Sequence, residues 1–272
     1  MIGFKDHSVI KNYLESYFAL LTEFYNANKL KINAEKTNYI IVCKKRYRYL
    51  FKNFSFLANN CVIKPCRMIK ILGTYLRDDL SWDTEVGKLA ANLQNRIFNI
   101  KKLTYVTNFQ TRLQFVNGFV IGKMRYMLPL YNNATKIQLT KLHRVVMTAA
   151  RCIIGSYCCR SSTLQILTKC NWLTLHNMIQ HSSLTLIHKI LTTCTPPSLH
   201  SMYNTHNTRI SKDISPKYIP MCAQYKKFYI INCIKLYNQI PSKIKSKTQN
   251  YFKTQCKRWL ISNVPGVSDT CD

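Results

Sequence analysis

The sequence predicts an α+β fold, in which residues 1–79 combine one helix with short strands and the remainder is mainly helical. The first observation is a series of short β-rich runs before residue 80. The second is the recurrence of apolar residues at helical spacing in long stretches after Ser81. The third is composition: 47% of the 272 residues are apolar, enough to bury a core in one or two domains.

The first part of the chain begins with a helix expected over residues 9–28. Its apolar residues share one face at helical spacing: Val9, Tyr13, Tyr17, Leu20 and Phe24. Strands are expected over residues 37–42, 54–57, 61–63 and 69–76. Asn59 and Asn60 separate the second strand from the third and indicate a hairpin turn. Asp78 and Asp79 end the last strand in a turn that caps the next helix.

The second part reads as a succession of helices. They are expected over residues 82–105, 109–128, 135–154 and 173–191, punctuated by Asn108, Pro129 and Gly155. Residues 198–220 form a looser polar stretch without a regular pattern. Two further helices are expected over residues 226–239 and 249–261.

The charge balance points to a polyanionic partner. Forty Lys and Arg residues against eleven Asp and Glu residues give a net charge of +29. Between Val86 and Val267 the only carboxylate is Asp213, so a solvated face of alternating ion pairs does not explain the basic residues. Nucleic acid, RNA or DNA, is the expected partner, and an anionic membrane surface is the less favoured alternative. Tyr47 and Tyr49 lie among basic residues and are candidates for stacking on unpaired bases.

The twelve cysteines are expected to be core residues rather than disulfides or zinc ligands. The first residues lack an apolar leader, which predicts an intracellular protein of the nucleus or cytoplasm, not a secreted one. No run is long and apolar enough for a membrane span. Paired ligands at zinc-finger spacing are missing, and Cys170, His176 and His181 fall where a packed helix is expected. No metal site is therefore predicted.

Catalytic motifs are also missing from this sequence. Glycine-rich phosphate loops and the nucleophile elbow do not occur. Asp78 and Asp79 resemble the aromatic-x-Asp-Asp of polymerases, but two residues separate them from Tyr75 instead of one. No earlier carboxylate completes a two-metal site with them. We therefore predict no catalytic residue.

Several segments, in order, resemble the reverse transcriptases of non-LTR (LINE-type, jockey-like) retrotransposons. The first is similar to the family's "N-K-L-x-(I/L)-N-x-x-K-T" followed by an apolar strand: Asn28-Lys29-Leu30-Lys31-Ile32-Asn33-Ala34-Glu35-Lys36-Thr37. A second, Ile71-Leu72-Gly73 to Leu80-Ser81-Trp82, resembles the passage from palm to thumb, with Arg77 where the family has an acid. Later segments resemble "L-x-x-L-Q-x-x-A-x-R-x-I-x-G", with His143 in the Gln place, and "L-x-W-L-x-L" around Trp172. Tyr237-Asn238-Gln239-Ile240-Pro241 and Phe252 to Leu260 resemble the closing motifs.

The resemblance implies the end of a polymerase palm over residues 1–79, thumb-like helices over 80–130, a helical region over 131–197 and a basic segment over 198–272. The family's catalytic aspartates and their Mg²⁺ ions belong upstream of this segment, and residues 1–7 contain only Asp6. The helix over 9–28 has then lost its partners, so we expect an exposed apolar face on it.

The resemblance also implies site residues. Lys36 would lie near the incoming triphosphate, with a lysine that anchors the palm edge as the alternative. Seven cations on the thumb-like helices would grip phosphates, with a solvated helix face as the alternative: Lys88, Arg96, Lys101, Lys102, Arg112, Lys123 and Arg125. Two functions follow. One is an inactive polymerase segment that pairs with the missing upstream half; the other is a stand-alone nucleic-acid-binding module without enzymatic activity.

Overall fold

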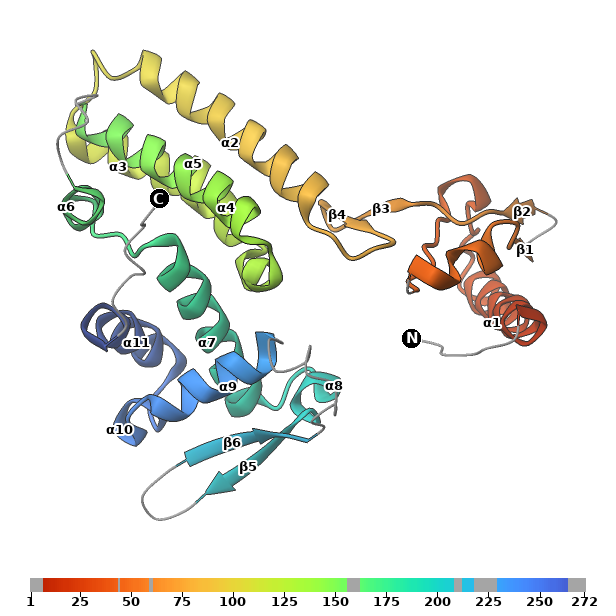
Figure 1. The fold of residues 1–272 in the computed structure, drawn as a ribbon. Coiled ribbons are helices and arrows are strands. Elements are labelled where there is room, and N and C mark those ends of the chain that lie inside the picture. Colours follow the sequence, from red (N-terminus) through yellow and green to blue (C-terminus); the bar gives the residue numbers. More distant parts are fainter. Residues whose placement is uncertain are drawn as a thin grey trace. The chain divides into compact units, whose positions relative to one another are not determined.

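The protein consists of two compact units, Met1–Glu85 and Val86–Asp272, and each is described by itself. A computed structural model describes residues 7–43, 45–58, 61–155, 162–207, 212–217 and 229–263 (Figure 1). Helices alternate with short antiparallel strand pairs, which confirms the mixed α+β class. The finer division into ranges ending at 79, 130 and 197 stays a prediction.

The Met1–Glu85 unit combines one long helix with two hairpins. Helix α1 spans His7–Ala27 and the 3-10 helices η1 and η2 span Ala34–Lys36 and Lys45–Phe51. Strands β1 (Phe56–Ala58) and β2 (Cys61–Ile63) pair antiparallel, as expected, although Asn59 and Asn60 lie outside the described residues. The expected strand over 37–42 is wrong. Only Tyr39 forms a bridge, to Pro65, because a β-rich run without a partner cannot build a ladder.

The single strand expected over residues 69–76 is also wrong, because the chain turns in its middle. Strand β3 (Met68–Ile71) and strand β4 (Thr74–Arg77) pair antiparallel, with Ile71 opposite Thr74. Leu72 and Gly73 connect them with φ of 48° and 87°. A two-residue hairpin with both φ angles positive matches the right-handed twist of the strands. Gly73 is the residue that indicates this turn in the sequence. Leucine rarely adopts a positive φ, so Leu72 gave no indication of a hairpin.

The core of this unit is small. Phe18 of α1 packs with Phe56 and Ile63 of the β1–β2 hairpin, and Tyr39 packs against them. The Tyr39 hydroxyl donates to the Phe54 carbonyl at 3.3 Å, and burial raises the pKa of Tyr39 to about 12. The expected exposed apolar face of α1 is confirmed. Its residues are 46–64% exposed: Val9, Tyr13, Tyr17, Leu20 and Phe24.

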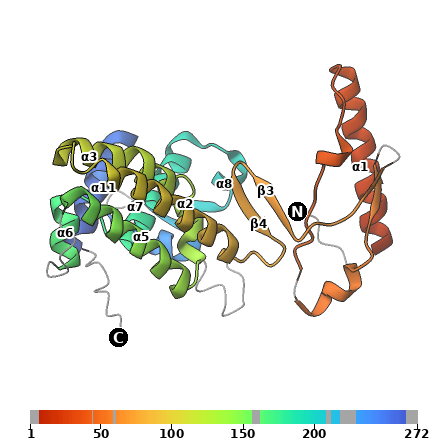
Figure 2. The same ribbon diagram turned by 90° about the horizontal axis from the view of Figure 1, so that it is seen from above.

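The Val86–Asp272 unit is mainly helical. Figures 1 and 2 show α2 (Asp83–Lys102), the α3–α4 stretch and α5 (Lys136–Ile154) running alongside one another. Thr135 and Gln138 form a reciprocal capping box at the start of α5, and Gly155 ends it with φ of 75°. Helix α6 (Thr163–Lys169) leads to α7 (Leu175–Thr193), which packs against α9 (Tyr229–Gln239) and α11 (Gln249–Asn263). The short helices α8 (Pro197–His200) and α10 (Ser242–Lys245) connect these elements.

The helix expected over residues 109–128 is interrupted. Helix α3 spans Phe109–Val116, η3 (Asn117–Ile121) is a π-helical segment, and α4 spans Gly122–Arg125. The 3-10 helix η4 (Leu128–Asn133) then carries Pro129 in its first turn, where the missing N–H costs nothing. A one-turn π insertion shifts the side chains after it around the helix axis and has no simple sequence signature.

The region after α8 forms a hairpin that the polar sequence did not predict. Strand β5 (Tyr203–Asn207) pairs antiparallel with β6 (Lys212–Pro216). The Asn238 side chain accepts from the Ile214 N–H at 3.0 Å and donates to the Ile214 carbonyl at 2.9 Å. This amide therefore satisfies the free edge of β6 as a neighbouring strand would. Only a helix distant in sequence supplies it, so the hairpin depends on tertiary structure.

The core between α7, α9 and α11 contains a fully buried histidine. His188 stacks on Phe252 with ring centroids 3.9 Å apart, and its Nδ1 lies 3.1 Å from the Tyr237 hydroxyl. Burial lowers the pKa of His188 below its usual range, as it does for His176 and His181. The folded state therefore resists protonation of these imidazoles.

We expect acid to destabilise this unit at the histidines. Because the unfolded state binds protons at higher pH than the folded state, stability should be retained near pH 7.5 and fall as pH drops below about 6.5. Urea unfolding at pH 7.5 and 5.5 measures this. His188→Gln, which keeps a hydrogen-bonding partner for Tyr237 and does not titrate, should show a smaller loss. The exposed control His206→Gln should behave as the parent; equal losses in all three chains would contradict the assignment.

Candidate nucleic-acid interface

The one carboxylate between Val86 and Val267 is used inside the fold. Asp213 pairs with Lys245 at 3.2 Å, and the ammonium also donates to the Asn238 carbonyl at 3.2 Å. The Lys245 side chain is only 2% exposed. The sequence offers no other carboxylate between Val86 and Val267 for the remaining basic residues of this stretch.

Helix α2 carries four of the predicted cations. Its first turn contains Asp83 and Glu85 and its last turn Lys101 and Lys102, an order that complements the helix dipole. Lys88, Lys101 and Lys102 are exposed, and the Lys102 ammonium lies 4.7 Å from the Phe98 ring centroid. Dipole stabilisation gives the last two lysines a structural role, but it does not neutralise them.

Arg96 is held by the protein rather than directed freely into solvent. Its Nε donates to Asn92 Oδ1 at 2.9 Å, and a terminal nitrogen donates to the Phe119 carbonyl at 2.9 Å. Phe119 belongs to the π-helical segment η3, whose hydrogen-bond pattern departs from that of an α-helix. Arg96 thereby ties α2 to η3, and its role in nucleic-acid contact stays a prediction.

Lys101 and Arg112 converge on the end of α5. Arg112 donates from Nε to the Asn108 carbonyl at 3.3 Å. A Cβ on Gly155 would stand 3.0 Å from an Arg112 guanidinium nitrogen, so this side chain reaches the end of α5. Burial raises the pKa of the Cys152 thiol, and the charges of Arg112 and Lys101 oppose that rise. These two cations from α2 and α3 thus lie at the negative end of the α5 dipole.

Arg125 belongs to a second cationic group that the sequence did not indicate. We call it the Arg125 cluster: Arg125 of α4, His181 of α7, and Lys253 and Lys257 of α11. His181 Nε2 lies 2.8 Å from the Lys253 carbonyl, and the Lys257 ammonium donates to the Asn171 carbonyl at 2.8 Å. Burial lowers the pKa of His181 and Lys257, and the Arg125 charge lowers both further.

The charged members of the Arg125 cluster come from two helices, Arg125 from α4 and Lys253 and Lys257 from α11, and burial disfavours the charged form of His181 on α7. Partial burial lowers the pKa of Arg125, and the Arg125 charge lowers the pKa of Lys257. Lys253 and Lys257 are four residues apart on α11, and that spacing in a stretch without acids was the available sequence signal.

The remaining predicted residues, Lys123 and Lys36, lie in different units. Lys123 of α4 is exposed, with its ammonium 5.8 Å from the Tyr126 ring centroid. Lys36 is exposed at the end of η1, where its N–H donates to the Asn33 side chain at 3.2 Å. Of the predicted residues, Lys101 and Arg112 therefore lie near the same end of α5. Arg125 lies near Lys253 and Lys257, which were not predicted. Lys36 belongs to the Met1–Glu85 unit.

The turn interpretation of Asp78 and Asp79 is confirmed. Asp78 pairs with Arg48 at 3.6 Å, and Asp79 pairs with Arg77 at 3.1 Å. Asp79 Oδ1 also accepts from the Ser81 N–H at 2.9 Å, just before α2. These contacts place both carboxylates in the turn between β4 and α2.

The expected packed helix around the Cys170, His176 and His181 triplet is confirmed. Trp172, Leu173, Leu175 and Ile179 are buried, and so is Cys170, whose thiol pKa burial raises to about 11. Across the described ranges, no three His, Cys, Asp or Glu side chains gather as metal ligands would. In those same ranges no helix has the length and apolarity to cross a bilayer.

Comparison with protein-family models, curated proteins and solved structures finds no match.

Proposed function

We propose that this chain binds RNA and DNA, mainly through their phosphates. The observation that carries the proposal is the lack of acidic counter-charge: Asp213 pairs with Lys245, and the sequence has no other carboxylate between Val86 and Val267 for the remaining cations. Like charges held near one another favour a polyanion, and each phosphate contact releases counterions. A titration of binding affinity against salt tests the proposal, since affinity should fall steeply.

We infer further that the chain is a segment of a non-LTR retrotransposon reverse transcriptase, downstream of the catalytic aspartates. The ordered motifs from Asn28 to Leu260 support this, together with strand pairs early in the chain and helices after them. The exposed apolar face of α1 is consistent with a missing upstream half as partner. In this proposal the protein acts in the nucleus or cytoplasm.

The alternative is a stand-alone nucleic-acid-binding module without enzymatic activity. The observation that favours it is the extensive core of the Val86–Asp272 unit, where Leu184, Phe252 and Leu260 are fully buried. The nucleotide sequence directly upstream of the Met1 codon discriminates the two. An aromatic-x-Asp-Asp in the same frame supports the polymerase segment, and its absence supports the module.

We expect the purified chain to extend no primed template. With Asp78 and Asp79 paired to arginines, the described part of the chain offers no carboxylate pair for the two metal ions that nucleotidyl transfer requires. The measurement is dNTP incorporation in Mg²⁺ and in Mn²⁺, with the double variant Asp78→Asn/Asp79→Asn as control. Incorporation by the parent that disappears in the double variant would contradict the turn interpretation.

A further inference from the structure

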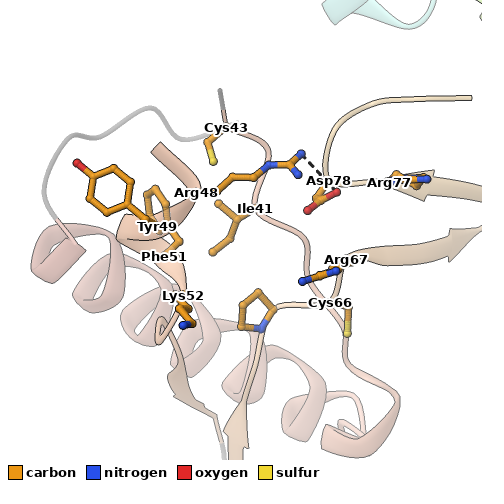
Figure 3. A pocket seen from close by; sticks show the side chains of 11 residues that line it. Ile41, Cys43, Arg48, Tyr49, Phe51, Lys52, Cys66, Arg67, Arg77 and Asp78 are labelled. Carbon is orange, nitrogen blue, oxygen red and sulfur yellow. Dashed lines mark ion pairs between the residues drawn. The ribbon is translucent and has the colours of Figure 1, made fainter. Parts of the chain in front are cut away.

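The Met1–Glu85 unit contains a cavity of about 520 Å³ with a cationic wall (Figure 3). It lies between η2, residues 41–43, the Pro65–Arg67 segment and the end of β4. Four of its lining residues are basic and one, Asp78, is acidic: Arg48, Lys52, Arg67 and Arg77 are the cations. Its volume falls within the range of small-molecule sites and admits a nucleotide-sized group.

Within the described residues, two of the four cations that line this cavity form no ion pair. Arg48 pairs with Asp78, and Arg77 pairs with Asp79 and reaches Thr84 Oγ1 at 3.4 Å. The side chains of Arg67 and Lys52 make no hydrogen bond or ion pair with the described part of the chain, and both residues are exposed. Arg48 Nε is buried without a hydrogen-bond partner there. The wall therefore offers donors to an anion.

An aromatic side chain stands beside this wall. Tyr49 of η2 is 72% exposed, and Figure 3 shows its ring directed away from the Arg48–Asp78 pair. An exposed tyrosine flanked by cations is the combination that binds single strands, where the bases stack on the ring and the phosphates meet the positive groove. A duplex keeps its bases stacked inside and cannot use the ring in this way.

We infer that this cavity is a binding site for an unpaired nucleic-acid strand, with a base stacked on Tyr49 and a neighbouring phosphate held by Arg67 and Lys52. The inference rests on the proposed function and names the form of nucleic acid that the Met1–Glu85 unit takes. It assigns a role to Tyr49 that is separate from the cations of α2 to α4.

The test uses the full chain and fluorescence anisotropy with a labelled twelve-residue oligouridylate and a blunt duplex. Tyr49→Ala should weaken oligouridylate binding roughly tenfold, within the range measured for base stacking, and leave duplex binding unchanged. Tyr49→Phe should retain the affinity and Tyr49→Leu should lose it, which separates stacking from bulk. Tyr17→Ala, at an exposed tyrosine of α1 in the same unit, is the matched control and should not alter binding. Arg67→Gln/Lys52→Gln should flatten the salt slope for the oligonucleotide by about 0.7 for each residue.

Three results would overturn the inference. The first is single-strand affinity that Tyr49→Ala leaves unchanged, with duplex binding intact; the proposed function would then survive without this site. The second is displacement of the oligouridylate by free UTP at equal nucleotide concentration, which would indicate a mononucleotide pocket. The third is a parent chain that binds neither probe, which would remove the proposed function as well.

Discussion

Asp213→Ala is expected to destabilise the Val86–Asp272 unit by about 3 kcal/mol, near the lower end of the range for breaking a buried ion pair. The substitution leaves the Lys245 ammonium buried, with the Asn238 carbonyl and the Tyr237 ring, 5.1 Å away, as its remaining partners. We expect the lower end because the Asp213 side chain is itself 39% exposed. Urea unfolding followed by circular dichroism measures the loss.

The matched control is Lys245→Met, which keeps the length of the buried side chain and removes its charge. Asp213 can then turn its exposed carboxylate to water, so the loss should stay below about 1.5 kcal/mol. We therefore predict that Asp213→Ala lowers the free energy of unfolding more than Lys245→Met does. An Asp213→Ala chain as stable as Lys245→Met would mean that the ion pair does not organise the β6–α10 contact.

Removing three exposed cations should weaken nucleic-acid binding by roughly a hundredfold or more at 0.1 M salt. The positions are Lys101, Lys102 and Lys123, all changed to Gln; each phosphate contact is worth about 0.9 log unit there. Lys102 and Lys123 lie over the rings of Phe98 and Tyr126, so their ammonium groups remain at the surface. RNA and DNA of any sequence should weaken alike, because phosphate contacts read no bases.

The control for this variant keeps the charge. Changing the same three lysines to Arg should retain the affinity within a few-fold, because arginine also binds phosphate. Anisotropy titrations on mixed-sequence RNA and DNA compare the three chains. An unchanged affinity in the Gln variant, or an equal loss in the Arg variant, would place the binding surface elsewhere.

Periodicity predicted the long helices because they depend mainly on local pattern. The helices α1, α5, α7 and α11 begin and end within about two residues of their expected limits, with Thr135 and Gly155 as visible caps for α5. Strands were less predictable. Residues 37–42 have the composition of a strand but no partner, whereas the polar β5–β6 hairpin forms with help from Asn238.

The excess of basic residues followed from the sequence, but the sequence did not show which of them lie near one another. Arg125 is far in the chain from Lys253 and Lys257, and only the folded structure brings its charge near Lys257 and His181. The structural use of Arg96 was likewise hidden, since it depends on the Phe119 carbonyl within a π-helical segment. Tyr49 was a stacking candidate because of its basic neighbours; it is 72% exposed, and its stacking role stays a prediction.

The measurement that tests the proposed function most directly is the affinity of the full chain for mixed-sequence RNA and DNA as a function of salt concentration. We predict a linear fall of log affinity with log salt, with a slope of about −4 or steeper for duplex DNA, as expected for roughly five neutralised phosphates. Scrambling the sequence should change the affinity by no more than a few-fold. A flat salt dependence, or strong binding confined to one sequence, would contradict a phosphate-binding interface on this chain.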